Sequence, residues 1–192
     1  MGREFELKYR ANEKALGEIR EKFGEFTPIS METAYYDTQD GLLNRLHWTL
    51  RRRYENGESV CTLKTPAAGG GRGEWEVHAP DIAAALPLLQ QLDTPEAFRI
   101  FTAECLVLSC GARFTRLAKT LEIPGAVVEL ALDQGVLLGG GKELPFAELE
   151  VELKEGSEEA AVAFAQALAE DFSLEPEKYS KHARAVALAK QK

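Results

Sequence analysis

The stretch Glu4-Phe5-Glu6-Leu7-Lys8-Tyr9 alternates strictly between charged and apolar residues. Successive side chains of a β-strand point to opposite faces, so this alternation predicts a strand over residues 3–10 with one charged and one apolar face. The same alternation returns late in the chain as Glu148-Leu149-Glu150-Val151-Glu152-Leu153. Strands that repeat a stripe of charges indicate a charged interior, and a charged interior needs a charged ligand.

With 45% of its 192 residues hydrophobic, the chain is long enough for one well-filled domain or at most two small ones. Because no linker marks a boundary, we expect a single domain over residues 1–192. The net charge of −8 argues against a nucleic-acid partner, because such binding depends on neutralising phosphates with basic residues. No apolar run reaches the length of a membrane span, and the first residues lack the basic and apolar regions of a signal peptide. Three cysteines that cannot all pair, none of them in a CxxC motif, favour a reduced, cytoplasmic protein.

Turn signals and alternating segments predict a mainly antiparallel arrangement of strands. Asn56-Gly57 is a strong hairpin signal between strands at 48–54 and 59–64. Further strands are predicted at 33–38, 73–78, 106–108, 113–119, 126–132 and 146–154, and helices after Asn12, at 81–92 with a break at Pro87, at 157–169 and at 180–189. The pattern gives an α+β fold, and closing such a sheet into a barrel would remove its edges and enclose a cavity.

The other predicted strands place charged side chains in the same phase. These positions are Arg51 and Arg53, Lys64, Glu74 and Glu76, Arg116, Glu129 and Asp133. The opposite positions, such as Leu50, Leu63 and Trp75, form an apolar face that helices must cover. Any one charged face alone is best interpreted as a solvated surface. The joint pattern instead places the charges on one common surface or lumen.

This set of charges suits one class of ligand. Carboxylates from both ends of the chain supply the hard oxygen donors that Mg²⁺ or Mn²⁺ prefers. Lys8, Arg51, Arg53, Lys64 and Arg116 supply donors for phosphoryl oxygens, and arginine can bind them in bidentate fashion. Like charges in a narrow cavity would cost several kcal/mol each without partners, and a metal with a polyphosphate neutralises both sets. The residues therefore indicate a metal-dependent phosphoryl-transfer site.

A series of segments, in order along nearly the whole chain, resembles the CYTH superfamily, the triphosphate tunnel metalloenzymes. The segments are the ExExK pattern of Glu4, Glu6 and Lys8, Tyr35-Tyr36-Asp37-Thr38, Leu50-Arg51-Arg52-Arg53, Thr62-Leu63-Lys64, Arg72-Gly73-Glu74-Trp75-Glu76, Phe114-Thr115-Arg116, Asp133-Gln134-Gly135, Glu148 to Leu153, and Ser180-Lys181. ExExK alone is a weak signal, whereas so many segments in register are a strong one. Within the family the pattern is most similar to bacterial inorganic triphosphatases.

The resemblance implies an eight-stranded antiparallel β-barrel, or tunnel, flanked by helices, whose lumen holds a linear triphosphate and a divalent metal. The implied metal ligands are Glu4, Glu6, Glu148 and Glu150, supplemented by Asp133 and Glu74. The implied phosphate-binding residues are Lys8, Arg51, Arg53, Lys64, Arg116 and Lys181, the last identified only through the resemblance. Catalysis is assigned to Lys8, Glu6 and Glu150. Whether Lys8 acts as a base or only binds phosphate is left open, as is the number of metal ions.

The predicted function is metal-dependent hydrolysis of inorganic triphosphate to diphosphate and phosphate. A cyclase is disfavoured, because residues 33–37 replace the H-A-R-F-type strand of the cyclase branch. One alternative is thiamine triphosphatase or another organic triphosphate hydrolase, for which Tyr36 and Trp48 offer aromatic side chains. Others are a non-catalytic polyphosphate- or nucleotide-binding protein and a plain structural barrel. The expected partner is a small-molecule triphosphate, without nucleic acid or membrane, and a homodimer is left open.

Overall fold

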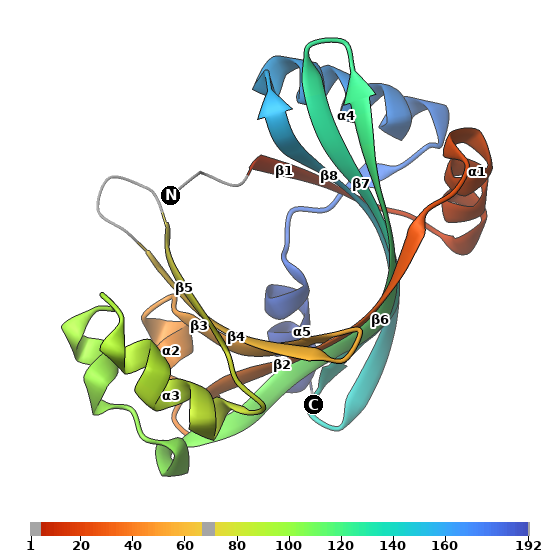
Figure 1. Ribbon diagram of the computed structural model, residues 1–192. Helices are drawn as coiled ribbons and strands as arrows, with labels where there is room; N and C mark the ends of the chain where they lie inside the picture. Colours follow the sequence, from red (N-terminus) through yellow and green to blue (C-terminus); the bar gives the residue numbers. More distant parts are fainter. Residues whose placement is uncertain (1–4, 67–71, 192) are drawn as a thin grey trace.

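The computed structural model describes residues 5–66 and 72–191, which form one curved sheet with five α-helices packed against it (Figure 1). The strands are β1 (Phe5–Arg10), β2 (Thr27–Thr38), β3 (Thr49–Glu55), β4 (Glu58–Pro66), β5 (Arg72–His78), β6 (Leu106–Ile123), β7 (Ala126–Gly139), β8 (Lys142–Gly156) and β9 (Glu175–Pro176). The helices are α1 (Glu13–Phe23), α2 (Leu42–Arg45), α3 (Ile82–Gln91), α4 (Glu158–Asp171) and α5 (Lys181–Lys190). Two short 3₁₀ helices, η1 (Glu96–Ile100) and η2 (Ala103–Cys105), lead from α3 to β6.

The strands pair antiparallel in the order β5-β4-β3-β2-β6-β7-β8-β1-β9. The sheet curls into an incomplete ring (Figure 1). Within the described ranges no ladder joins β5 to β1 or β9, so the edges of the sheet stay separate. The predicted α+β class and the antiparallel sheet flanked by helices are confirmed. Eight long strands are present as expected, with the two-residue β9 added beside β1, and the sheet is strongly curved and open where closure was expected.

The largest difference from the predicted strands is in β6, which runs without interruption from Leu106 to Ile123. Two separate strands were predicted on either side of Gly111. A Cβ atom at Gly111 would lie 2.7 Å from the Thr33 carbonyl oxygen of β2. Because glycine has no such atom, β2 and β6 can approach closely there and the ladder continues past this position.

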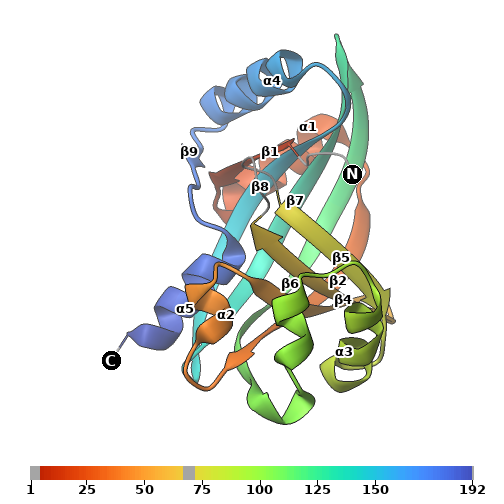
Figure 2. The same cartoon turned by 90° about the vertical axis from the view of Figure 1, so that its left-hand side faces the viewer.

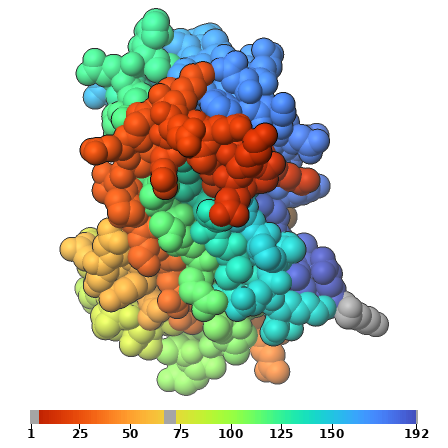
Figure 3. All heavy atoms as spheres, turned by 90° about the vertical axis from the view of Figure 1, so that its right-hand side faces the viewer, coloured from red at the N-terminus to blue at the C-terminus, as the bar shows by residue number. Residues whose placement is uncertain are grey.

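Helices cover the convex face of the sheet, as the apolar phase of the strands requires. Over β7 and β8, Ala161 and Leu168 of α4 pack against Val128, Leu130 and Val151. A second cluster under α3 is formed by β3 and β4, and Figure 2 shows α4 and α3 at opposite ends of the molecule. In Figure 3, α1 (red to orange) lies over the green and teal strands. Each fully buried aliphatic side chain contributes about 1.5–3 kcal/mol to folding.

The predicted helix starts are confirmed by their capping hydrogen bonds. Asn12, Ser157 and Ser180 each accept a bond from the backbone N–H three residues later, at 2.9, 3.2 and 3.1 Å. The prediction of a break at Pro87 is wrong, because α3 continues through this residue. Leu86 and Leu89 on either side of it are buried, and their packing offsets the backbone hydrogen bond that proline cannot make.

Helix α5 differs from the others because it lies on the concave side of the sheet (Figure 1). Its residues Ala185 and Leu188 pack with Met31, Ala112 and Leu137 from the sheet. At Gly139 a Cβ atom would lie 2.4 Å from the Ala185 carbonyl oxygen, so a glycine is required for this close approach. The packing fixes the first residue of α5, Lys181, inside the curve of the sheet.

Two further expectations concern the thiols and the membrane. Cys61 and Cys110 are buried and Cys105 is exposed, and none forms a disulfide. Burial raises the pKa of both buried thiols to about 11, so they stay protonated and unreactive at neutral pH. None of the described helices combines the length and the apolar character needed to cross a membrane.

Candidate active site

A charged cavity of about 180 Å³ lies on the concave side of the sheet. It is lined by Glu6, Lys8, Thr33, Tyr35, Arg51, Arg53, Lys64, Phe114, Arg116, Glu150, Glu152, Ser180 and Lys181. Six of these side chains are cationic, and they are the six that the sequence predicted to bind phosphate. The cavity therefore gathers residues from six strands and from α5, although they are spread over most of the sequence.

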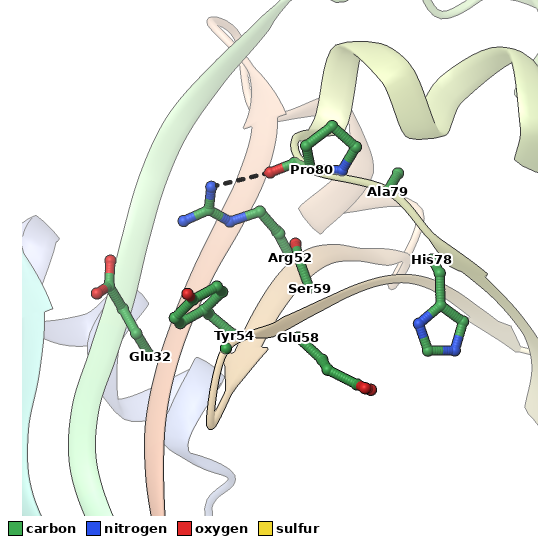
Figure 4. A pocket seen from close by; sticks show the side chains of 9 residues that line it. Glu32, Arg52, Tyr54, Glu58, Ser59, His78, Ala79 and Pro80 are labelled. Carbon is green, nitrogen blue, oxygen red and sulfur yellow. Dashed lines mark hydrogen bonds between the residues drawn. The ribbon is translucent and has the colours of Figure 1, made fainter.

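A larger depression, of about 660 Å³, lies on the outer face of the β3–β5 region. Figure 4 shows Arg52 directed toward Pro80. The Nη1 atom of Arg52 donates a hydrogen bond of 3.3 Å to the Pro80 carbonyl oxygen. Glu32 and Glu58 also line this depression, so its one arginine is outnumbered by carboxylates. Such a mixture suits an anionic ligand far less than the smaller cavity does, and we place the candidate active site in the smaller one.

One side of the cavity is a basic wall formed by Arg51 and Arg53 of β3 and Lys64 of β4. The register places Arg51 opposite Tyr35 and Arg53 opposite Thr33, so both arginines point to the concave side. Burial and the charge of Arg53 lower the pKa of Arg51. The Nε atoms of both arginines are buried and have no hydrogen-bond partner among the described residues. Buried cationic donors that lack partners favour an anionic ligand.

The other side is a carboxylate triad of Asp133, Glu148 and Glu150. Asp133 of β7 lies directly opposite Glu148 of β8, and both are fully buried. One oxygen from each of the three carboxylates can be chosen so that all lie within 4.8 Å of one another. Three buried negative charges so close together would repel strongly without compensating cations.

Arg116 and Lys181 compensate most of this charge. Arg116 forms a bidentate pair with Asp133, with both bonds at 2.8 Å, and contacts Glu150 at 2.5 Å. The Lys181 Nζ lies 2.7 Å from Asp133 and 2.8 Å from Glu150, and it also bonds Glu148. Lys181 therefore contacts all three carboxylates at once.

The contacts shift the pKa values of these groups in opposite directions. Burial would raise the pKa of Glu150, but the charges of Lys181 and Arg116 outweigh it and lower the pKa to about 2. For Glu148 burial dominates and raises the pKa. Burial would lower the pKa of Lys181, yet the three carboxylates raise it well above its usual range. Lys181 is therefore protonated at neutral pH and cannot act as a general base.

A second layer of contacts holds the triad from behind. Arg184, one turn after Lys181 on α5, bonds the other oxygen of Glu148 and lies 3.4 Å from Glu177. Glu177 accepts a hydrogen bond of 2.8 Å from Arg10 Nε, which ties this layer to β1. The Phe146 ring lies 5.4 Å from the Arg184 guanidinium, close enough for a cation–π contact.

Two other predicted metal ligands, Glu6 and Glu74, do not join the triad. Glu6 lines the cavity and accepts a hydrogen bond of 3.1 Å from Lys8. Glu74 lies on β5, at the opposite side of the sheet, and pairs with Lys64 at 2.9 Å. Glu4 lies outside the described residues. Of the five predicted ligands that lie within the described residues, the structure thus brings three together.

The triad is chemically suited to a hard divalent cation. Carboxylate oxygens are the donors that Mg²⁺ and Mn²⁺ prefer, and the Lys181 ammonium shows that the cluster accepts a shared cation. Asp133, Glu148 and Glu150 would hold such an ion. When bound, it would polarise a phosphoryl oxygen and offset charge that develops on the phosphates.

Several residues of the site were not assigned from the sequence. Glu152, Thr33, Tyr35, Phe114 and Ser180 line the cavity. Glu152 follows the same alternation as its neighbours on β8 and could have been included on that ground. Arg184 carried a weaker signal, its helical spacing from Lys181. Glu177 stands in an irregular segment, where no periodicity shows which way a side chain points.

Comparisons with known proteins identify a relative in sequence. An inorganic triphosphatase of Haemophilus influenzae is 29% identical over 175 residues, which are 88% of this chain and 50% of that protein. The chain thus spans about half the length of this curated relative.

Solved structures share the fold. HpAC1 from Hippeastrum, described as a candidate adenylyl cyclase with a dominant triphosphatase activity, superposes with a TM-score of 0.72 at 17% identity, covering 98% of this chain and 97% of that one. The PH1819 protein of Pyrococcus horikoshii OT3 gives a TM-score of 0.60 at 22% identity, covering 98% and 99%. The sequence model of the CYTH domain matches residues 2–186. With nearly its whole length matched, the chain belongs to the CYTH domain family.

Proposed function

We propose that this protein hydrolyses inorganic triphosphate to diphosphate and phosphate, with Mg²⁺ or Mn²⁺ as cofactor. The observation that carries the proposal is the meeting of six cationic side chains and a buried carboxylate triad in and beneath one cavity of about 180 Å³. The similarity to an inorganic triphosphatase over 88% of the chain supports the same substrate. A cytoplasmic location remains a prediction from the free cysteines.

In this proposal the basic wall binds the phosphate chain. Arg51 and Arg53 line the cavity, where their guanidinium groups could form bidentate contacts with phosphoryl oxygens, and their buried Nε atoms lack hydrogen-bond partners among the described residues. Lys8 lines the cavity and donates a hydrogen bond of 3.1 Å to Glu6, and from this position its nitrogen can also donate to a phosphoryl oxygen. Arg116 and Lys181 stand between the phosphates and the triad.

The hydrolytic step needs a water molecule held in line with the terminal phosphorus. The water oxygen forms the new P–O bond, the bridging P–O bond breaks, and diphosphate leaves. Glu6 has a carboxylate at the cavity with 42% of its side chain exposed, so it can orient the water and accept its proton. The fixed cations stabilise the charge that develops on the transferred group, which is the main source of catalysis in phosphoryl transfer.

An organic substrate is less well supported. Trp48, one of the aromatic residues considered for a thiamine or nucleoside group, packs against Phe98 and Phe101 outside the cavity. Tyr36 packs against the same cluster. Of the two aromatic residues that line the cavity, Tyr35 contacts the tilted ring of His182 at 4.5 Å between centroids, and Phe114 contacts the edge of Phe146 at 5.6 Å. The two aromatic residues considered for an organic group thus pack in a hydrophobic cluster and do not line the cavity.

The decisive test is phosphate release from inorganic triphosphate, thiamine triphosphate and ATP, each with Mg²⁺, with Mn²⁺ and with EDTA. We expect fast, metal-dependent release from inorganic triphosphate alone. Arg116→Gln should abolish most of it, whereas Arg113→Gln is a matched control on the same strand. Arg113 points outward, is 61% exposed and pairs with Glu143. Equal loss in both variants, or faster release from an organic substrate, would contradict the proposal.

A further inference from the structure

The carboxylate triad is already neutralised by cations of the chain itself. The Lys181 ammonium contacts one oxygen of Asp133 at 2.7 Å and one of Glu150 at 2.8 Å, and it also bonds Glu148. These distances place it where a metal ion shared by the three carboxylates would have to sit. Lys181 and a divalent ion therefore compete for the same oxygens.

In the absence of other ligands, the charge balance favours the Lys181 ammonium over a divalent ion at the triad. The triad carries three negative charges, and Arg116, Lys181 and Arg184 bring three positive ones. Asp133 and Glu148 are fully buried, so these charges neutralise one another in a medium of low dielectric constant. A divalent ion that entered alone would leave two uncompensated positive charges there, which is costly. A triphosphate that entered with it would bring the negative charge that restores neutrality.

The Lys181 side chain can also reach a second binding partner without any movement of the backbone. It is the first residue of α5, with Ser180 as the cap, so only its flexible side chain has to turn. Its side chain lines the cavity beside Arg116 and Ser180, within reach of an anion bound there. The helix itself stays anchored through Ala185 and Leu188.

We propose that Lys181 is an internal stand-in for the divalent ion: its ammonium holds the triad until the ion arrives together with an oligophosphate, and then transfers to the phosphate. The inference rests on the proposed function, because it names how the same site takes up its ligands. Metal alone then binds weakly, and metal with triphosphate binds tightly.

The exchange can be tested by thermal unfolding of the full chain with Mn²⁺ alone, with imidotriphosphate alone and with both. Imidotriphosphate is a suitable analogue because its P–N–P bridges resist hydrolysis. For the wild type we expect almost no shift with Mn²⁺ alone and a rise of about 5 °C or more with both ligands at saturation. Lys181→Met should melt at a lower temperature without ligand, because the triad loses its shared cation. It should gain a clear shift with Mn²⁺ alone.

Arg53→Met is the matched control, since Arg53 lines the same cavity and pairs with Glu55 at 3.2 Å. This variant should lose part of the shift caused by imidotriphosphate and gain none with Mn²⁺ alone. The inference would be overturned if Mn²⁺ alone raised the melting temperature of the wild type as much as both ligands together. It would also be overturned if Mn²⁺ alone did not raise the melting temperature of Lys181→Met.

If Lys181→Met does not fold, the wild type decides the question by electron paramagnetic resonance of free Mn²⁺. Relative to the same solution without protein, its signal should fall on adding protein only when imidotriphosphate is present, and a fall without the analogue would refute the exchange. Failure of the proposed function would look different, because it would appear as absent phosphate release while these binding results stood.

Discussion

The two sides of the cavity handle charge in opposite ways. On the basic wall, the buried Nε atoms of Arg51 and Arg53 make no hydrogen bond within the described part of the chain. On the carboxylate side, each member of the triad binds two cationic side chains. The basic wall therefore has donors available for an anionic ligand, and the carboxylate side contributes to the stability of the fold. Substitutions on the two sides should separate these properties.

The largest effect is expected from Glu148→Gln on the carboxylate side. Removing this charge leaves Lys181 and Arg184 with too few partners, and breaking such a buried pair costs about 3–5 kcal/mol of unfolding free energy. Phosphate release should fall about 100-fold or more, as when a fixed electrostatic contact is lost. Urea unfolding and phosphate release measure the two effects.

The control is Glu143→Gln on the same strand. Glu143 forms an exposed pair with Arg113, so its loss should lower the free energy of unfolding by less than about 1 kcal/mol. Equal stability of both variants would show that the triad is not part of the stabilising framework.

Arg51→Met should have the opposite profile. It removes a buried guanidinium that is repelled by Arg53, so the unfolding free energy should stay equal or rise. Affinity for triphosphate should fall about 10- to 100-fold, since a hydrogen bond to a charged group is worth about 1.5–3 kcal/mol. Titration with imidotriphosphate measures this loss, and Arg52→Met on the outer face is the control. A strongly destabilised Arg51→Met would mean that the basic wall also supports the fold.

A smaller effect should follow pH at Glu177. Burial would raise its pKa, but the hydrogen bonds from Arg10 and from the Tyr179 N–H, with the charge of Arg184, lower it below the usual 4.5. A carboxyl with a lowered pKa in the folded state stabilises above its unfolded pKa and loses that contribution as the pH falls through its folded value.

The stability gap between wild type and Glu177→Gln should therefore be full at pH 6 and shrink below pH 4.5. Urea unfolding across this range measures it, with the exposed Glu175→Gln as control. A gap that does not change with pH would exclude a charged contact at Glu177.

The smallest effect is expected from Glu74→Gln. Glu74 was predicted to supplement the metal ligands, but it pairs with Lys64 across β4 and β5 and is partly exposed. The Mn²⁺ concentration that gives half-maximal phosphate release should stay within about threefold of wild type, because Glu74 is not part of the carboxylate triad. A tenfold rise would restore Glu74 to the metal site and place the ion closer to the basic wall.

The alternation of charged and apolar residues was enough to predict the sheet and most of the cavity lining. Period-two spacing fixes which face a side chain occupies, so Arg51, Arg53 and Arg116 could be assigned to one lumen before any contact was known. Lys181 could not be placed in this way, because its position depends on how α5 packs against Gly139. Glu177 and the open edges of the sheet depend on tertiary contacts that no local pattern encodes.

The separation of charge between the cavity and the rest of the molecule has a kinetic consequence. The chain carries a net charge of −8, whereas the cavity lining holds six cationic and three anionic side chains. An approaching polyanion is therefore repelled by the exterior before the cavity attracts it. Added salt screens the exposed charges more than the enclosed ones, so the association rate should rise with ionic strength. A triphosphate already complexed with a divalent ion carries less negative charge and meets a smaller barrier.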